Sequence, residues 1–215
     1  MKNKTGLFIL IALLAIPAIW VLLWKKSEFQ YDTLPIYSEV IMGDTVPMTI
    51  DTFTLTDQYG HTFTRDSIGD RVYVANFFFA RCPDVCPQMN SNLKLVADKF
   101  KNNPGVVFLS HTVDPLHDTV EVLAEYAHEF RAEGNSWYFL TGKKSTIYGL
   151  AEQSYKQVAV KHDDDTFIHS EKLILVDKDF RIRGFYEGRD YKDILRLQDD
   201  IPFLLKLYKE GKEDE

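Results

Sequence analysis

The sequence is short of the residues on which several protein classes depend. Its 215 residues include two cysteines, too few for a disulfide scaffold but enough for one redox pair or part of a metal site. Basic residues are not in excess, since 25 lysines and arginines stand against 32 acidic residues, and this argues against non-specific nucleic-acid binding. Internal repeats and low-complexity tracts are also missing. The hydrophobic content of 45% nevertheless suits one folded domain and excludes a disordered chain.

One long apolar run lies near the N-terminus. Residues 6–24 carry no charged side chain, and as a helix they would span roughly 28 Å, about the thickness of a bilayer core. Lysines flank the run on both sides, and Trp20 and Trp24 suit an interfacial position. We predict an uncleaved transmembrane anchor. A cleaved signal peptide is the alternative, but its apolar region would be shorter and would end at small residues, unlike Ile16-Pro17-Ala18.

The anchor divides the chain into unequal parts. We expect a cytoplasmic N-terminus at 1–5, a tether at 25–48, a folded domain at 49–209, and a frayed, solvated acidic tail at 210–215. The first 26 residues hold four lysines and no acidic residue, which leaves 21 bases against 32 acids, a net charge of −11, on the rest. The N-terminus lacks the arginine- and serine-rich pattern of a mitochondrial transit peptide. We therefore expect a single-pass protein of the bacterial inner (cytoplasmic) membrane with its domain in the periplasm.

Hydrophobic patterns within the domain predict alternating strands and helices. The near-continuous apolar run at 72–80 is typical of a central strand that is covered on both faces. A polar loop is expected at 161–167. The other expected elements are a hairpin beginning at 49–56, strands at 106–112, 137–140, 172–176 and 182–186, and helices at 89–100, 120–130, 143–154 and 191–209. This order predicts the α/β class.

Both cysteines belong to the segment CPDVCP at 82–87, where the buried strand meets a helix. The start of a helix favours a thiolate over a thiol. If the segment is helical, Cys82 and Cys86 lie on one face, where they can form a disulfide or hold one metal ion. Two buried structural cysteines are the alternative, but Pro83, Pro87 and the strand–helix junction argue against it.

A histidine would complete a metal site. Soft sulfur ligands select copper(I) or zinc, and an imidazole as third ligand gives a trigonal copper site. Among six histidines, His162 and His169 bracket an acidic segment, and His169 directly precedes the strand at 172–176. If that strand lies beside the strand at 72–80, the loop before it faces the cysteines. His111 lies within a predicted strand, where it can face the core.

The order of these motifs resembles the Sco/SenC family, which are membrane-anchored copper chaperones with a thioredoxin-like fold. CPDVCP follows an aromatic-rich strand, Val113-Asp114-Pro115 and Asp118-Thr119 come next, and His169-Ser170 precedes a hydrophobic strand. The similarity covers roughly residues 49–207, including the segments FTLTDQYG and VDKDFRIRGFYEG. The resemblance implies a thioredoxin-like fold with an N-terminal β-hairpin extension, preceded by a single transmembrane helix.

The resemblance also implies a function. One copper ion per chain would be bound by Cys82, Cys86 and His169 and delivered to the binuclear copper centre of cytochrome c oxidase. The partners would be the copper-centre subunit of the oxidase and a copper donor or thiol reductant. His162 has no counterpart in the family pattern, and His111 stands where a more apolar residue is expected.

Two other functions remain open. A thiol–disulfide oxidoreductase that keeps the cysteines of an oxidase subunit reduced would need Cys82 and Cys86 but not His169. The second function that remains open is a redox or copper sensor, although the sequence shows no separate output domain. Thioredoxin-type oxidoreductases place a proline opposite their active-site turn, and this chain has none between Pro115 and Pro202. That difference favours metal holding over disulfide exchange.

Overall fold

The computed structural model describes residues 33–83, 85–132, 134, 136–157, 159–162, 165–168 and 170–214, together with 13, 15–17, 19 and 20. For 159–162 and 165–168 it describes the backbone alone. The chain divides into two units, Met1–Thr33 and Leu34–Glu215. Within the described residues, no helix has the length and apolar character needed to cross a bilayer. Most of the predicted anchor at 6–24 lies outside the described residues.

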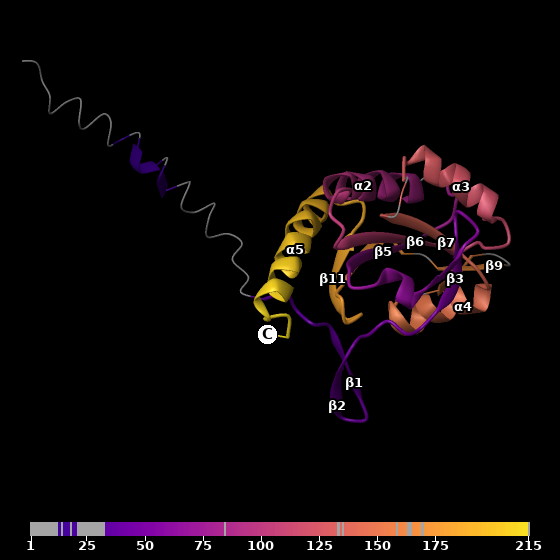
Figure 1. The fold of residues 1–215 in the computed structure, drawn as a ribbon, viewed down its shortest axis with the longest axis horizontal. Helices are drawn as coiled ribbons and strands as arrows, with labels where there is room; N and C mark the ends of the chain where they lie inside the picture. The colour runs from indigo at the N-terminus through magenta and orange to yellow at the C-terminus, as the bar shows by residue number, and fades with distance from the viewer. Residues whose placement is uncertain are drawn as a thin grey trace, which may run out of the picture. The chain divides into compact units, whose positions relative to one another are not determined.

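The second unit is built on a seven-stranded sheet in the order β11-β10-β5-β6-β7-β3-β4 (Figure 1). The three central strands β5, β6 and β7 are parallel, while the flanking pairs β10–β11 and β3–β4 are antiparallel. The strands are β3 (Thr54–Asp57), β4 (Thr62–Thr64), β5 (Val72–Phe78), β6 (Val106–Thr112), β7 (Trp137–Thr141), β10 (Lys172–Val176) and β11 (Ile182–Glu187). Strand β5 is buried along its whole length, as its continuous apolar sequence predicts.

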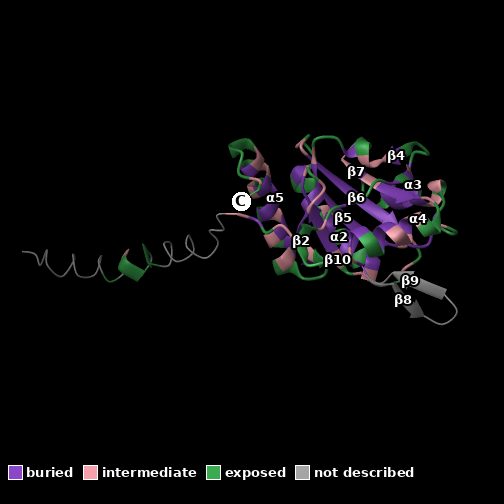
Figure 2. Cartoon of the chain, turned by 90° about the horizontal axis from the view of Figure 1, so that it is seen from below, coloured by how far each residue is buried: buried purple, intermediate pink, exposed green. Residues whose placement is uncertain are grey.

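Helices cover both faces of the sheet, so two apolar cores form (Figure 2). Residues such as Val74 and Phe78 of β5 belong to the core under α2 (Val85–Phe100), α3 (Val120–Glu129) and α5 (Tyr191–Glu210). The alternate residues Tyr73, Ala75 and Phe77 belong to the core under α4 (Lys144–Gly149) and the π-helical turn η2 (Leu150–Ser154). A short 3-10 helix, η1 (Arg65–Ile68), contributes Ile68 to that second core. The predicted α/β class is confirmed.

Two segments are more ordered than the sequence predicts. The predicted tether at 25–48 contains an antiparallel hairpin, β1 (Ser38–Ile41) with β2 (Asp44–Pro47), while its residues 25–32 lie outside the described residues. The loop predicted at 161–167 is wrong, because β8 (Ala159–His162) pairs with β9 (Asp165–Ile168). β-branched residues such as Thr166 and Ile168 favour a strand, and the run of acidic residues concealed them.

A buried ion pair closes the sheet at the end where β5 begins. The Arg183 side chain is completely buried and donates to Asp177 Oδ2 at 3.0 Å. It also donates to the carbonyl oxygens of Leu34 at 2.8 Å, Pro35 at 3.1 Å and Glu213 at 2.8 Å. The prediction of a frayed tail is therefore wrong for Glu213, and the beginning of the unit is fixed at Leu34, earlier than the predicted boundary at residue 49.

Candidate metal site

The cysteine motif lies where β5 leads into α2, at the carboxyl end of the central strand. Helix α2 begins at Val85, so Cys86 is in its first turn and Cys82 precedes the helix. The condition under which both sulfurs would lie on one helical face, a helical segment, is therefore not met at Cys82. Instead, the backbone N–H of Cys86 donates to Cys82 Sγ at 3.4 Å. This contact holds the first sulfur over the start of the helix, where N–H groups have no partner within the helix.

The two thiols differ in exposure. Both are free, but Cys86 is buried whereas Cys82 is half-buried. Burial raises the pKa of the Cys86 thiol to about 12, and a contact with the backbone of Phe79 offsets this only in part. The predicted preference of the helix start for a thiolate is thus outweighed at Cys86 by the loss of solvation. Of the two cysteines, Cys82 is the more accessible to an incoming ligand.

Asp118 supports the backbone immediately before the motif. Its carboxylate is buried and accepts a hydrogen bond from the Ala80 N–H at 3.1 Å, and a second from the Thr112 hydroxyl. Burial raises the pKa of Asp118, while these two hydrogen bonds act in the opposite direction. Because β5 ends at Phe78, the Ala80 contact fixes the direction in which the chain turns toward Cys82.

Asp114 forms a second carboxylate contact beside the motif. It accepts from Arg81 Nε at 2.8 Å and from His117 Nδ1 at 2.9 Å, and its backbone N–H is bonded to Thr112 Oγ1 at 3.0 Å. Asp114 and Asp118 belong to the segment that carries the family resemblance, but residue patterns alone assigned them no role. Their role is to hold the two residues that precede Cys82.

A buried polar network lies behind the site and joins α2 and α3 to the sheet. Asn90 Oδ1 accepts from Asn76 Nδ2 at 2.8 Å, and Asn90 Nδ2 donates to the Tyr126 hydroxyl at 3.0 Å. Ser110 donates to Asn76 Oδ1 at 2.6 Å and accepts from Trp137 Nε1 at 2.9 Å. Since α2 also carries Cys86, this network fixes the second cysteine relative to three strands.

The third predicted ligand, His169, lies outside the described residues, and of His162 only the backbone is described. The condition that favoured His169 is nevertheless met, because β10 runs antiparallel beside β5 with Ile174 opposite Ala75. The start of β10 therefore lies at the carboxyl end of β5, where the cysteines follow. The residue after His169 is held as well, since the Ser170 hydroxyl donates to Gln157 Oε1.

The described residues do not complete a metal site by themselves. Among them, no group of three or more histidine, cysteine, aspartate or glutamate side chains is arranged to hold a metal ion. His111, whose place in a strand allows it to face the core, is fully buried against Phe53, Phe77 and Tyr155. Its Nε2 atom has no hydrogen-bond partner among the described residues, and burial lowers its pKa to about 4.

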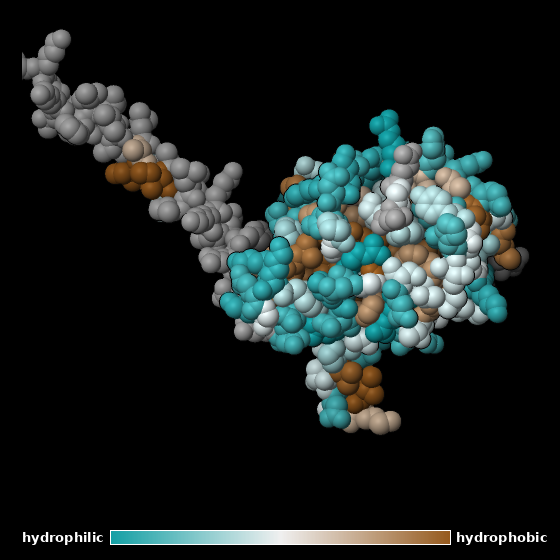
Figure 3. All heavy atoms as spheres, in the orientation of Figure 1, coloured by the Kyte–Doolittle hydropathy of each residue, from teal (hydrophilic) through white to brown (hydrophobic). Residues whose placement is uncertain are grey.

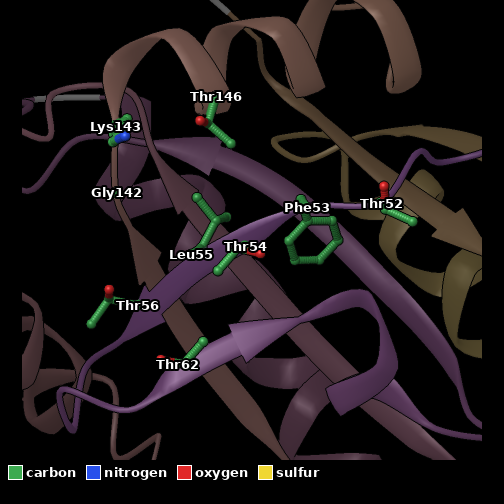
Figure 4. A pocket seen from close by; sticks show the side chains of 9 residues that line it. All are labelled: Thr52, Phe53, Thr54, Leu55, Thr56, Thr62, Gly142, Lys143 and Thr146. Atoms are coloured by element: carbon green, nitrogen blue, oxygen red, sulfur yellow. The ribbon is translucent and has the colours of Figure 1, made fainter.

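Two cavities differ in their relation to the cysteines. One of about 560 Å³ is lined by Thr54, Leu55 and Thr146, among others, near the end of β7 (Figure 4). Strands β6 and β7 separate β3, which lines this cavity, from the strand that leads to the cysteines. The other, of about 360 Å³, is lined by Arg81, Tyr126 and residues of α3. Only the second adjoins the motif.

Comparisons with known proteins agree on one family. The SCO1/SenC family model matches residues 44–201. A SCO1 protein homolog of Bacillus subtilis is 30% identical over 152 residues, which cover 68% of this chain and 79% of that protein. The structure of Arabidopsis thaliana ScoI with copper bound has a TM-score of 0.63 at 28% identity and covers 74% of this chain and 99% of that one.

A second solved structure extends the comparison. BsSco, described as a member of the Sco family of cytochrome c oxidase assembly proteins with a disulfide switch, has a TM-score of 0.66 at 28% identity. The match covers 74% of this chain and 95% of that one. These structural similarities confirm the thioredoxin-like fold.

Proposed function

This chain belongs to the SCO1/SenC family, and from that premise we propose that it is a copper chaperone for the assembly of cytochrome c oxidase. It carries one copper ion and delivers it to the binuclear copper centre of the oxidase's copper-centre subunit. The observation that carries the proposal is the pair of free thiols at the carboxyl end of β5, with Cys82 half-buried and Cys86 buried in the first turn of α2.

The donor set fits copper as cargo. Two sulfur ligands select soft metal ions such as copper(I), and the proposed third ligand, His169, completes a three-coordinate site. The hydrogen bond between Ser170 and Gln157, and the position of β10 beside β5, support this choice of histidine. The copper-bound Arabidopsis ScoI structure supports the choice of metal. Thiolate ligands lose their protons when the metal binds, so loading releases protons.

Delivery requires that copper pass to ligands of the partner. The half-buried Cys82 is the sulfur that an incoming thiol or imidazole reaches first. The cavity lined by Arg81 and Tyr126 offers space beside the turn that precedes Cys82. We propose that residues 6–24 anchor the chain in the bacterial inner membrane with the domain in the periplasm. The length of this run and its lack of charged side chains support the anchor.

A copper titration tests the proposed ligands. The reduced full-length chain in nanodiscs is titrated with copper as wild type, Cys82→Ser, His169→Ala and His162→Ala. We expect one copper ion per wild-type chain, loss of tight binding in Cys82→Ser, and a weaker complex with a changed spectrum in His169→Ala. His162→Ala is the matched control from the same segment and should behave as wild type. Identical titrations of His169→Ala and wild type would remove this histidine from the site.

A thiol–disulfide oxidoreductase is the second candidate, because two free thiols lie next to each other at a helix start and the related BsSco has a disulfide switch. This function needs only Cys82 and Cys86, with an upstream thiol reductant. Reduction of an oxidised copper-centre subunit is measured for the same variants. Full reductase activity in His169→Ala, together with unchanged copper binding, would favour the reductase over the chaperone.

A further inference from the structure

The β1–β2 hairpin exposes an apolar tip. Val40, Ile41 and Met42 are 72%, 48% and 102% exposed, and Val46 on the second strand is 39% exposed. The hairpin projects from the second unit, and its hydrophobic residues stand out on the surface (Figure 1, Figure 3). Asp44 is the residue paired with Ile41 across the turn. Clustered exposed apolar residues at the end of a projection are a recurrent feature of contact sites.

The turn is not built for stability. Met42 and Gly43 occupy its two central positions, with φ of 53° and 96°. Turns with positive φ at both positions favour asparagine or aspartate before glycine, and a methionine with φ above zero is strained. Met42 lowers the stability of the fold in two ways, because its apolar side chain is exposed to water and its backbone is strained. The sequence at the tip therefore serves something other than folding.

The base of the hairpin is held firmly. The Tyr37 N–H donates to the Ile182 carbonyl at 3.0 Å, and the Ile182 N–H donates to the Met48 carbonyl at 3.0 Å, so the flanks of the hairpin pair with the start of β11. Tyr37 packs edge-on against Phe185 with ring centroids 5.0 Å apart. Lys156 Nζ lies 2.9 Å from a carboxylate oxygen of Glu39. The tip is thus presented on a fixed support.

The hairpin and the cysteines lie at opposite ends of the sheet. Ile182 is paired with Val176, and Val176 is paired with Tyr73 near the start of β5. The cysteine motif follows the other end of β5. Seven residues of strand separate the two ends by about 20 Å.

We propose that the tip of the β1–β2 hairpin rests in the lipid interface of the bilayer that holds the anchor, an inference that depends on the proposed anchoring of residues 6–24. Nine residues lie between Trp24 and Leu34, so the ten steps that join these two residues reach at most about 36 Å when fully extended. If residues 6–24 are anchored, the base of the hairpin can lie no farther than this from the bilayer, and each four-residue strand adds about 13 Å of reach.

The charges near the tip define the kind of lipid contact. Asp44 is exposed, Glu39 is paired with Lys156, and the chain beyond residue 26 has a net charge of −11. The tip therefore does not bind through attraction to anionic headgroups. It binds through insertion of its apolar side chains into the lipid interface. Tethering raises the local concentration of the tip, so even a small apolar contact is populated. The contact would direct the cysteine end away from the bilayer, toward an approaching partner.

Quenching by brominated lipid tests the contact. Full-length Met42→Trp and wild type are placed in phosphatidylcholine nanodiscs with and without brominated acyl chains, and the wild-type emission is subtracted. A large excess of discs leaves at most one chain in each, so a second copy cannot cover the tip. We expect most of the emission added by Met42→Trp to be quenched and shifted to shorter wavelength, as in an apolar surrounding.

The control is Leu116→Trp, an exposed position in the loop after β6, at the cysteine end of the sheet. Its added emission should not be quenched. If the chain co-migrates with the discs but Met42→Trp is as unquenched as Leu116→Trp, the hairpin contact is overturned and the anchor stands. If the chain does not co-migrate with the discs, both the anchor and the contact are overturned, whereas the copper titration still decides the chaperone proposal.

Discussion

Charged side chains lie at both ends of β5, and the two groups are organised differently. Where the strand begins, the buried guanidinium of Arg183 has four oxygen partners from four residues: Leu34, Pro35, Asp177 and Glu213. All four partners belong to this chain, and the hydrogen bonds to them tie the first and last residues of the unit to β11. This end is closed.

Where β5 ends, the charged groups hold a turn and leave its cysteine accessible. Asp118 and Asp114 bind the backbone of Ala80 and the side chain of Arg81, and Cys82 comes next and is half-buried. Arginine and aspartate side chains thus serve different purposes at the two ends of β5. Complete pairing fixes the chain ends at Arg183, whereas pairing that stops one residue before Cys82 orients the thiol and keeps it accessible.

The largest expected effect comes from breaking the closed end. Arg183→Met leaves the buried Asp177 with Arg181 as its remaining ion-pair partner and removes the donor to three carbonyl oxygens. Loss of one member of a buried pair typically costs 3–5 kcal/mol, and because Arg181 stays in place we expect a loss of about 3 kcal/mol. The free energy of unfolding is measured by urea denaturation of the unit Leu34–Glu215.

Arg189→Met is the matched control for this change. Arg189 is 41% exposed and contacts Gln88 and Glu171 at the surface, so its loss should change the free energy of unfolding by about 0.5 kcal/mol or less. Equal effects of the two substitutions would show that the buried cluster does not close the unit.

A second test concerns His111, a buried ionisable residue without the pairing that Arg183 has. Burial lowers its pKa from 6.5 to about 4, so the neutral form is favoured in the folded chain. A group with a lowered pKa loses its stabilising contribution as the pH falls from the unfolded pKa to the folded one. Between pH 6.5 and 4 we therefore expect His111 to lower the stability of the unit by roughly 3 kcal/mol.

The measurement is the difference between wild type and His111→Leu in urea denaturation across this pH range. The variant should have the shallower acid dependence, because it lacks the group that must be protonated while buried. His128→Gln, at an exposed position on α3, is the control and should follow the wild-type curve. Parallel curves for His111→Leu and wild type would exclude His111 as a cause of acid sensitivity.

The sequence predicted elements whose hydrophobic period is strong. The continuous run of β5 and the helical spacing of α2 and α5 are confirmed. The β8–β9 hairpin was missed because polar residues hide its pattern, and the ordered Leu34 was missed because its partner, Arg183, lies 149 positions away. No local pattern encodes a contact at that distance in the chain.

The candidate site was also predictable only in part, because the sequence shows local spacing but not contacts between distant residues. The spacing of Cys82 and Cys86 marked them as a pair, but it did not show that Cys82 precedes the helix and that Cys86 is buried. Nor did it show that Asp118 binds Ala80, since that contact joins the loop after β6 to the end of β5. The assignment of His169 remains a prediction.

The smallest expected effect concerns the open end. Asp118→Ala removes the acceptor for the Ala80 N–H and the Thr112 hydroxyl, so the turn before Cys82 loses its support. Outer contacts that orient metal ligands typically change metal affinity by about 10- to 100-fold, and we expect copper binding to weaken toward the lower end of that range. The affinity is measured on the reduced full-length chain by competition with a copper chelator.

His117→Ala is the control for Asp118→Ala. It tests whether losing any charged contact near the motif weakens copper binding, or only losing the contact that orients Cys82. His117 contacts the carboxylate of Asp114 at 2.9 Å, and its side chain is 56% exposed. Its removal should leave the copper affinity within about twofold of wild type, as expected for a solvent-screened contact. If His117→Ala and Asp118→Ala weaken copper binding equally, the buried hydrogen bond to Ala80 is not what positions Cys82, and the open end would depend on its surface charges.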